Sequence, residues 1–224
     1  RILSAGCSSG EEPYSLAIML CEWERRGLPA SWDRWHVHAV DVSSAALARA
    51  EAGVYSEWSL RETPRELRER WFVKRGRSFE VRREPRDAVT FEQRSLFGED
   101  GPLAPPASFD VIFCRNVLMY LTPEAMRAVV SQLTGALVPG GHLFLGHAES
   151  LRGGTSELTI ESSHGAFYYR RTPEGAQVPA ERRQRPITET VSRPSPSIPV
   201  PVAAPERIAP SRAPTLDDVE QLVS

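Results

Sequence analysis

Short apolar runs alternate with amphipathic runs over residues 1–171, and this alternation limits the chain to few folds. The pattern predicts a closing pair of strands at residues 159–162 and 166–170, preceded by strands at 1–7, 36–42, 89–94, 109–114 and 142–146. It predicts helices at residues 11–26, 44–52 and 123–137. Strands that alternate with helices are typical of a parallel sheet covered by helices. The sequence therefore predicts an α/β fold, in which the uniformly apolar run 109–114 is buried on both faces.

The composition changes after about residue 171. Ten of the 19 prolines lie in residues 172–224, which contain no Phe, Trp or Tyr. Such a segment buries too little apolar surface to offset the entropy of ordering it. We therefore expect one domain over residues 1–171 and a disordered proline-rich linker over residues 172–224. A short helical pattern at residues 215–223 is consistent with the start of a further module.

Several classes of protein are disfavoured by what the chain lacks. No apolar run reaches the roughly 18 residues that a membrane helix needs, so we expect no direct membrane insertion. The net charge of −2 gives no argument for nucleic-acid binding. Cys7, Cys21 and Cys114 lie far apart, which favours a reduced, cytoplasmic protein. His36 and His38 alternate on one predicted strand, but no further ligand lies at a fitting spacing, and we expect no metal site.

The first predicted strand runs into a loop with two glycines and two carboxylates. Gly6 and Gly10 allow the backbone to turn tightly and to approach a ligand, and Ser9 and Glu12 have the spacing of a capping box. Glu11 and Glu12 occupy the helix start where a diphosphate would need bare amides. The loop therefore favours a cationic ligand without phosphate, such as S-adenosylmethionine, over a dinucleotide. The alternative is that both glutamates only favour the helix dipole and its cap.

Polar residues also follow the second strand and the apolar strand 109–114. Asp41 ends the second strand, where a carboxylate can accept hydrogen bonds from ribose hydroxyls or, alternatively, cap a helix or form a turn. Arg115 and Asn116 follow the buried strand directly, and a guanidinium in that position needs an anionic or hydrogen-bonding partner. Tyr120 lies five residues further on and is expected to aim its hydroxyl at the same pocket.

Four blocks of sequence, in order, resemble the chemotaxis-receptor glutamate O-methyltransferases of the CheR type; they lie at residues 4–15, 41–43, 113–120 and 139–151. The resemblance implies a class I S-adenosylmethionine-dependent methyltransferase fold, Rossmann-like, with a mostly parallel seven-stranded sheet and a small antiparallel β subdomain inserted after the second strand. It implies methyl esters formed on glutamate side chains of methyl-accepting chemotaxis receptors. It places Tyr120 near the transferred methyl group and gives as cofactor contacts Gly6, Glu11 or Glu12, Asp41, Arg115 and Asn116.

The chain also departs from the family pattern. The family has Asn-Leu after the third strand, where this chain has Ser95 and Leu96, and serine has the shorter reach. The chain opens with Arg1 rather than Met, and we expect the natural N-terminus to lie upstream. The family's N-terminal helical domain and its arginine-bearing linker are not in the sequence, so we expect this piece alone to bind the cofactor weakly.

Residues 55–87 interrupt the alternation and are expected to form the inserted subdomain. Residues 61–87 carry ten basic and six acidic side chains, which would steer acidic helical substrates, so we assign receptor binding to this insertion. A merely solvated charged helix is the alternative. Nucleic-acid binding is disfavoured because Trp71, Phe72 and Phe79 look like core residues.

Three functions other than receptor methylation remain open or disfavoured. A methyltransferase of the same fold acting on another substrate is one alternative, because fold alone does not fix the substrate. A non-catalytic binding or scaffold domain of a chemosensory pathway is another. A nicotinamide oxidoreductase is disfavoured by the carboxylates of the first loop. We expect a monomer whose partners are the cytoplasmic domains of the receptors.

Overall fold

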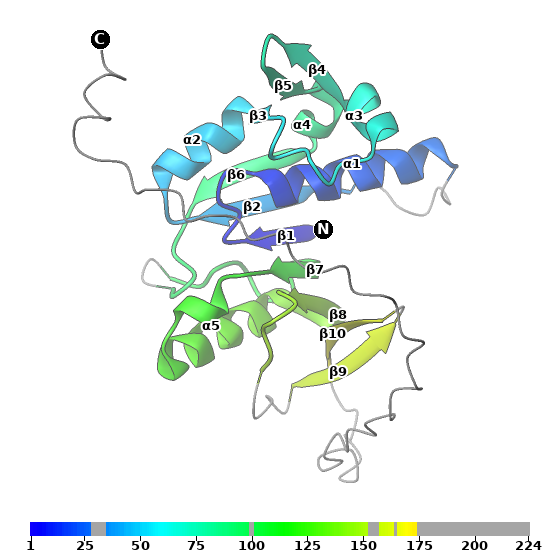
Figure 1. Ribbon diagram of the computed structural model, residues 1–224. Helices are drawn as coiled ribbons and strands as arrows, with labels where there is room; N and C mark the ends of the chain where they lie inside the picture. Colours follow the sequence, from blue (N-terminus) through cyan, green and yellow to red (C-terminus); the bar gives the residue numbers. More distant parts are fainter. Residues whose placement is uncertain (28–34, 99–100, 152–156, 164, 174–224) are drawn as a thin grey trace, which may run out of the picture. The chain divides into compact units, whose positions relative to one another are not determined.

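The computed structural model describes residues 1–27, 35–98, 101–151, 157–163 and 165–173 (Figure 1). All of them belong to one unit of the chain, Arg1–Val178. The segment 172–224, expected to be a linker, lies outside the described residues apart from Thr172 and Pro173. No helix in the described part is long and apolar enough to cross a membrane.

A seven-stranded sheet forms the centre of the described chain, in the order β6-β2-β1-β7-β8-β10-β9. The strands are β1 (Ile2–Ala5), β2 (Val37–Asp41), β6 (Val89–Gln93), β7 (Phe109–Cys114), β8 (Leu137–Leu145), β9 (Leu158–Ser163) and β10 (Ala166–Arg171). The pairs from β6 to β8 are parallel, whereas β10 pairs antiparallel with both β8 and β9. This confirms the mostly parallel sheet and its closing antiparallel pair.

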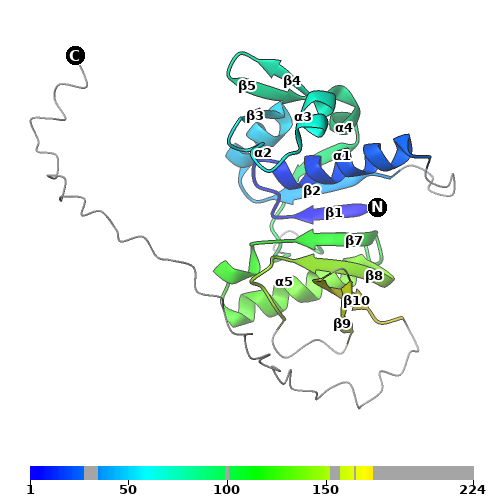
Figure 2. The ribbon, with the colours of Figure 1, turned by 45° about the vertical axis from the view of Figure 1, so that its right-hand side comes forward.

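Helices cover both faces of this sheet. Successive side chains of a strand point to opposite faces, so neighbouring residues of β1 pack against different helices. Ile2 of β1 packs in the cluster that contains the buried side chains of α1 (Glu11–Arg25), whereas its neighbour Leu3 packs in the cluster of α5 (Pro123–Ala136). Helix α2 (Ser44–Ala52) follows β2, and a 3₁₀ turn, η1 (Leu118–Tyr120), follows β7. Figure 2 shows α1 and α5 beside different parts of the sheet.

The start of α1 differs from the prediction. Its N-cap is Gly10, at φ 90°, and no side chain caps it. The capping box between Ser9 and Glu12 is therefore wrong: the Ser9 hydroxyl donates to Glu11 at 2.7 Å. Glu12 turns toward the sheet and accepts from the Ser4 hydroxyl of β1 at 2.8 Å. A left-handed glycine replaces the side-chain cap and leaves Glu12 free for that contact.

Strand β8 begins earlier than expected, at Leu137, directly after α5. It passes through Pro139-Gly140-Gly141 because the pairing with β7 is irregular there, between Phe109 and Val111. A Cβ on Gly141 would lie 2.9 Å from the Asp110 carbonyl oxygen, so only glycine allows this close approach. The expected strand 142–146 was thus too short because the irregular pairing cannot be read from the sequence.

The insertion forms a small antiparallel sheet, as the family resemblance implies, in the order β3-β5-β4. Its elements are β3 (Val54–Ser56), α3 (Arg65–Trp71), β4 (Phe72–Arg75), β5 (Ser78–Val81) and α4 (Arg83–Asp87). Trp71 and Phe72 are buried, as expected of core residues, whereas Phe79 is only partly buried and packs against the same cluster. The carboxylate of Glu22 on α1 accepts from Arg70 at 2.7 Å and from the Trp71 indole at 2.8 Å. These bonds attach the insertion to α1.

Candidate functional site

The parallel strands β1, β2 and β7 are neighbours in the sheet, so their carboxyl ends meet at one edge. The loops that leave this edge carry most of the residues singled out in the sequence. Binding sites of open α/β sheets lie outside the carboxyl ends of the strands, where the order of strands changes direction. Here the chain moves outward from β1 through β2 to β6 and then crosses to β7 on the other side of β1.

The loop after β1 is held in a shape that requires glycine at two positions. The amides of Gly6 and Cys7 both donate to the carbonyl of Val40, at 2.8 and 3.0 Å. Gly6 has φ 78°, and a Cβ placed on it would lie 2.5 Å from Cγ2 of Val117. At Gly10 a Cβ would lie 2.8 Å from the Tyr55 hydroxyl oxygen. The backbone of this loop therefore approaches its neighbours as closely as only glycine permits.

Glu12 and Arg115 meet across the sheet edge. Oε2 of Glu12 lies 3.6 Å from Nη1 of Arg115, while Oε1 accepts from the buried Ser4 hydroxyl. This supplies the anionic partner expected for Arg115. Burial raises the pKa of Glu12 above its usual value, and the Ser4 and Arg115 contacts only partly oppose that rise. A partly buried carboxylate with a raised pKa is a property shared by many ligand-binding sites.

Asp41 holds the loop after β1 rather than capping the next helix. Its Oδ2 accepts from the amide of Ser8 at 2.8 Å, and its Oδ1 accepts from the amide of Ser43 at 2.9 Å. The N-cap of α2 is Ser43, whose hydroxyl accepts from Ala46. Asp41 is thus a turn former and not the N-cap. A carboxylate oxygen has two lone pairs, so both oxygens retain capacity for further donors.

Arg115, Asn116 and Tyr120 lie in the loop after β7, with their side chains exposed. Asn116 adopts φ 58°, a left-handed conformation that asparagine tolerates better than most residues. Tyr120 ends η1, and its side chain is 79% exposed. Among the described residues, the hydroxyl of Tyr120 makes no hydrogen bond to the other predicted site residues. The structure therefore places Tyr120 on the same loop as Arg115 without joining their side chains.

The remaining predicted residues lie at the margin of this edge. Ser95 follows β6, and its hydroxyl accepts from the amide of Phe97 at 3.2 Å. Leu96 is half-buried and packs against the cluster on the α5 side of the sheet. Glu11 is exposed at the start of α1 and accepts from Ser9. No described contact joins Ser95, Leu96 or Glu11 to Arg115.

Two residues at this edge were not assigned to the site from the sequence. The Tyr55 hydroxyl, from the insertion, donates to the carbonyl of Ser9 at 2.8 Å and so ties the insertion to the first loop. Glu149 follows β8, and no role in the site was assigned to it from the sequence. It accepts from the amides of Gly146, Asn116 and Met119, at 2.7, 2.8 and 3.1 Å, and so also holds the loop after β7. Its place in the block 139–151 was the one signal in the sequence.

No cluster of three metal-ligating side chains occurs in the described ranges. His36 and His38 contact Thr90 instead, at 2.9 and 3.1 Å, and His38 also contacts Glu92 at 2.9 Å.

The composition of the edge suits a ligand with positive charge and hydrogen-bond donors. Asp41 and Glu12 present carboxylates there, and the one guanidinium among the predicted site residues, that of Arg115, is already paired with Glu12. A diphosphate would meet two carboxylates at the start of α1, which its charge disfavours. Gly6 lets the first loop approach Val117 of the loop after β7, and so brings these two loops together at the edge. The residues present therefore fit S-adenosylmethionine, which carries an amino group, a sulfonium and ribose hydroxyls.

Comparison with known proteins also indicates S-adenosylmethionine as the ligand. Residues 1–167 match the family described as "CheR methyltransferase, SAM binding domain". The chain is 35% identical over 172 residues to a chemotaxis protein methyltransferase of Vibrio parahaemolyticus, covering 76% of this chain and 61% of that protein. It is 37% identical over 153 residues to chemotaxis protein methyltransferase 1 of Pseudomonas aeruginosa, covering 67% of this chain and 55% of that protein.

Two further similarities concern the whole chain and the fold. The probable biofilm formation methyltransferase WspC of Pseudomonas aeruginosa is 33% identical over 234 residues, covering 100% of this chain and 50% of that protein. The solved N-methyltransferase NodS of Bradyrhizobium japonicum, in complex with S-adenosyl-L-homocysteine, superimposes with a TM-score of 0.43 at 19% identity, covering 77% of this chain and 78% of that chain. The chain thus spans about half to three fifths of these chemotaxis and biofilm relatives. It belongs to the CheR methyltransferase family, of which it contains the S-adenosylmethionine-binding domain.

Proposed function

We propose that this domain is the catalytic part of an enzyme that methylates glutamate side chains on the cytoplasmic domains of chemotaxis receptors and so forms glutamyl methyl esters. The observation that carries the proposal is the sheet edge at which the glycine loop, Asp41 and the pair of Glu12 and Arg115 meet. The names of the relatives, which are chemotaxis protein methyltransferases, support the choice of receptors as substrates.

The cofactor is assigned to residues along this edge. Gly6, in the loop after β1, is one of them, and the remaining lone pairs of Asp41 suit ribose hydroxyls. Further contacts are assigned to both glutamates of the first loop and to residues after β6 and β7, namely Glu11, Glu12, Ser95, Leu96, Arg115 and Asn116. When bound, S-adenosylmethionine supplies an electrophilic methyl group on a positively charged sulfur.

The chemistry asks the protein for alignment rather than for a base. A glutamate carboxylate has a reference pKa of about 4.3 and is already ionised at neutral pH. Holding two reactants in line contributes up to roughly 7–11 kcal/mol to lowering a barrier. Arg115 and Tyr120 lie exposed on the loop after β7, where they can orient a carboxylate that approaches from solvent. We therefore assign the catalytic roles to these two residues.

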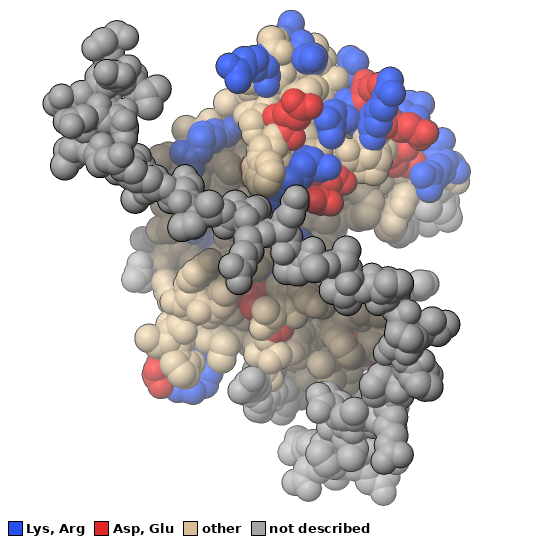
Figure 3. All heavy atoms as spheres, in the orientation of Figure 1, with Lys and Arg blue, Asp and Glu red and all other residues tan. Residues whose placement is uncertain are grey.

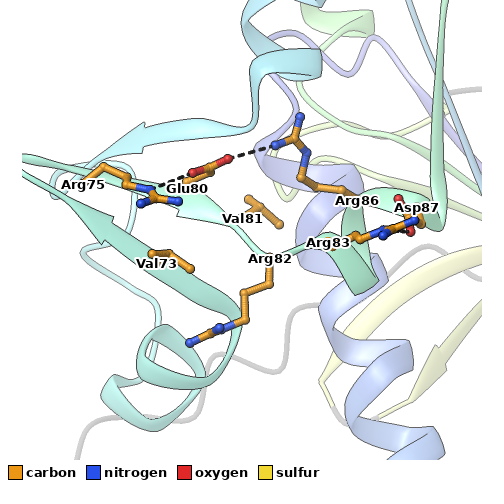
Figure 4. Close-up of a pocket in the computed structure, with 8 residues that line it drawn as sticks. All are labelled: Val73, Arg75, Glu80, Val81, Arg82, Arg83, Arg86 and Asp87. Atoms are coloured by element: carbon orange, nitrogen blue, oxygen red, sulfur yellow. Dashed lines mark hydrogen bonds and ion pairs between the residues drawn. The ribbon is translucent and has the colours of Figure 1, made fainter.

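The insertion, residues 55–87, is assigned to receptor binding. Figure 3 shows Lys and Arg side chains gathered over this part of the molecule. A cavity of about 410 Å³ lies between β4, β5 and α4 and is lined in part by Arg75, Arg82, Arg83 and Arg86. In Figure 4 Glu80 lies between Arg75 and Arg86, at 3.0 and 3.3 Å, whereas Arg82 makes no ion pair within the described part. The surplus of positive charge would attract an acidic receptor surface.

A receptor of a biofilm-formation system is a second candidate substrate, because the relative that aligns over the whole chain is named for biofilm formation. The proposal also places the protein in the cytoplasm, as a monomer whose partners are receptors rather than nucleic acid. A non-catalytic role in the same pathway is the remaining alternative.

Transfer of a radiolabelled methyl group from S-adenosylmethionine to receptor cytoplasmic fragments tests the proposal. We expect label on the fragments that mild base releases, because methyl esters hydrolyse in base and N-methyl products do not. Label that resists base would show methylation of another kind of group. Absence of label, while the cofactor still binds, would show another substrate or a non-catalytic role. The Tyr120→Phe variant should turn over more slowly than wild type, and equal turnover would remove its hydroxyl from the mechanism.

A further inference from the structure

One carboxylate joins the two loops that follow β7 and β8. Oε2 of Glu149 accepts from the amides of Gly146 and Asn116, at 2.7 and 2.8 Å, and Oε1 accepts from the amide of Met119 at 3.1 Å. The first amide belongs to the end of β8, and the other two belong to the loop that carries the proposed catalytic residues. A carboxylate that accepts several backbone N–H groups forms charge-assisted bonds, which are stronger than those between neutral groups.

The surroundings of this carboxylate show that its position is tightly specified. A Cβ placed on Gly146 would lie 2.5 Å from Oε2 of Glu149 and 2.9 Å from the amide nitrogen of Asn116. Glycine at 146 is therefore needed for the carboxylate to reach across. Asn116 itself has φ 58°, which costs free energy unless other contacts stabilise that conformation. The bond from Asn116 to Glu149 is one such contact.

The two oxygens serve different parts of the site. Oε2 holds the amide of Asn116, a proposed cofactor contact, whereas Oε1 holds the amide of Met119, which lies inside the turn Leu118–Tyr120. Tyr120 ends that turn and is itself exposed, so few contacts of its side chain fix it. The turn that carries Tyr120 is held by this bond from the Met119 amide, which joins it to the segment after β8, and by the buried side chain of Leu118.

We propose that Glu149 is a positioning residue for methyl transfer. Its Oε2 fixes the position of Asn116, on the cofactor-binding side of the loop, and its Oε1 fixes the turn that presents Tyr120 to the substrate. The proposal rests on the function proposed above for Arg115, Asn116 and Tyr120. It goes further in giving one side chain two separable effects, because each oxygen bonds to a different segment of the loop.

The variant Glu149→Gln separates these effects. An amide whose oxygen takes the place of Oε2 keeps the bonds to Gly146 and Asn116, but its NH₂ group then faces the Met119 amide, and that bond is lost. This orientation keeps two of three bonds and is favoured over the reverse. We therefore expect Glu149→Gln to bind S-adenosylhomocysteine within about threefold of wild type while its kcat falls roughly tenfold, the effect of losing one charged hydrogen bond. Glu149→Ala loses all three bonds and should weaken both, by about tenfold or more each.

The experiment measures calorimetric affinity for S-adenosylhomocysteine and steady-state kcat and KM for the intact protein and its variants. Glu124→Gln is the matched control, since Glu124 is an exposed carboxylate on α5 that pairs with Arg127, and it should leave all three quantities unchanged. Amide NMR signals of Asn116 and Met119 report the two segments directly. In Glu149→Gln the Met119 signal should shift more than the Asn116 signal, because only the Met119 bond is lost.

Equal losses of affinity and kcat in Glu149→Gln, or wild-type values in Glu149→Ala, would overturn the proposal. If Glu149→Ala does not fold, Glu149→Gln and the two amide signals still decide it. If the wild type transfers no methyl group to receptors, the proposed function fails, but the affinities and the amide signals still test whether Glu149 sets the two segments.

Discussion

Replacing Gly6 by alanine should destabilise the protein through one identifiable contact. Gly6 has φ 78°, where an L-residue with a Cβ is strained, and the added Cβ would lie 2.5 Å from Cγ2 of Val117. The left-handed conformation costs about 1–2 kcal/mol, and the smaller entropy of the unfolded alanine chain offsets about 0.4–1 kcal/mol. The overlap with Val117 adds about 1–3 kcal/mol. We therefore expect Gly6→Ala to lower the free energy of unfolding by about 1–5 kcal/mol in total.

Two further variants separate the strain from the overlap. Gly76 has φ 61° with no atom within 4 Å of an added Cβ, so Gly76→Ala carries only the conformational cost. The double variant Gly6→Ala with Val117→Ala removes the methyl group that the new Cβ would strike. We expect the two changes to cost about 1–2 kcal/mol less together than the sum of their separate effects.

Urea unfolding of the wild type, of Gly6→Ala, Gly76→Ala and the double variant, and of Val117→Ala alone measures these differences. The reasoning is refuted if Gly6→Ala costs no more than Gly76→Ala, or if the effects of Gly6→Ala and Val117→Ala simply add. Calorimetry with S-adenosylhomocysteine on the same proteins shows whether the loop also loses its ligand.

Three other perturbations have expected outcomes. Burial raises the pKa of Glu12 above its usual value, so ionising this carboxyl group destabilises the folded state as the pH rises above the pKa of the unfolded chain. Glu12→Gln should therefore gain stability over wild type, in urea unfolding, as the pH rises through this range, and parallel curves of stability against pH would contradict this. Arg82→Glu should raise KM for acidic receptor fragments roughly two- to fivefold at low salt, whereas Arg49→Glu on α2 should not; equal effects would remove the cavity from receptor binding. Glu22→Ala leaves its two partners on the insertion unpaired and should lower the unfolding midpoint more than Glu69→Ala, because the Glu69 carboxylate is exposed. Backbone hydrogen exchange in residues 65–81 should also become faster in Glu22→Ala, and unchanged exchange would show that other contacts attach the insertion.

The sheet could be predicted from the sequence because its signals are local. The apolar run at β7 and the polar residues at the strand ends, Asp41 and Arg115, each follow from neighbouring residues alone. The anionic partner of Arg115 was expected, but its identity was not, since Glu12 had been assigned to a cap. That assignment failed because Gly10 in a left-handed conformation already starts the helix.

The contacts that could not be predicted join segments far apart in sequence. Tyr55 reaches Ser9 across 46 positions, and Glu149 reaches Asn116 across 33. Neither pair of residues has a spacing by which the bond could be recognised in a single sequence. The insertion shows the same limit, because β4 is short and ends in Lys74 and Arg75 and so lacks the alternation of a half-buried strand. Trp71, just before β4, and Phe72, its first residue, are buried in the cluster that contains the α1 side chains, a contact between distant segments.

Calorimetric titration of the intact protein with S-adenosylhomocysteine and, separately, with NAD tests the central claim most directly. An edge with carboxylates at Glu12 and Asp41, which repel a diphosphate, should bind one equivalent of S-adenosylhomocysteine and give no heat with NAD. Binding of NAD without binding of S-adenosylhomocysteine would contradict it.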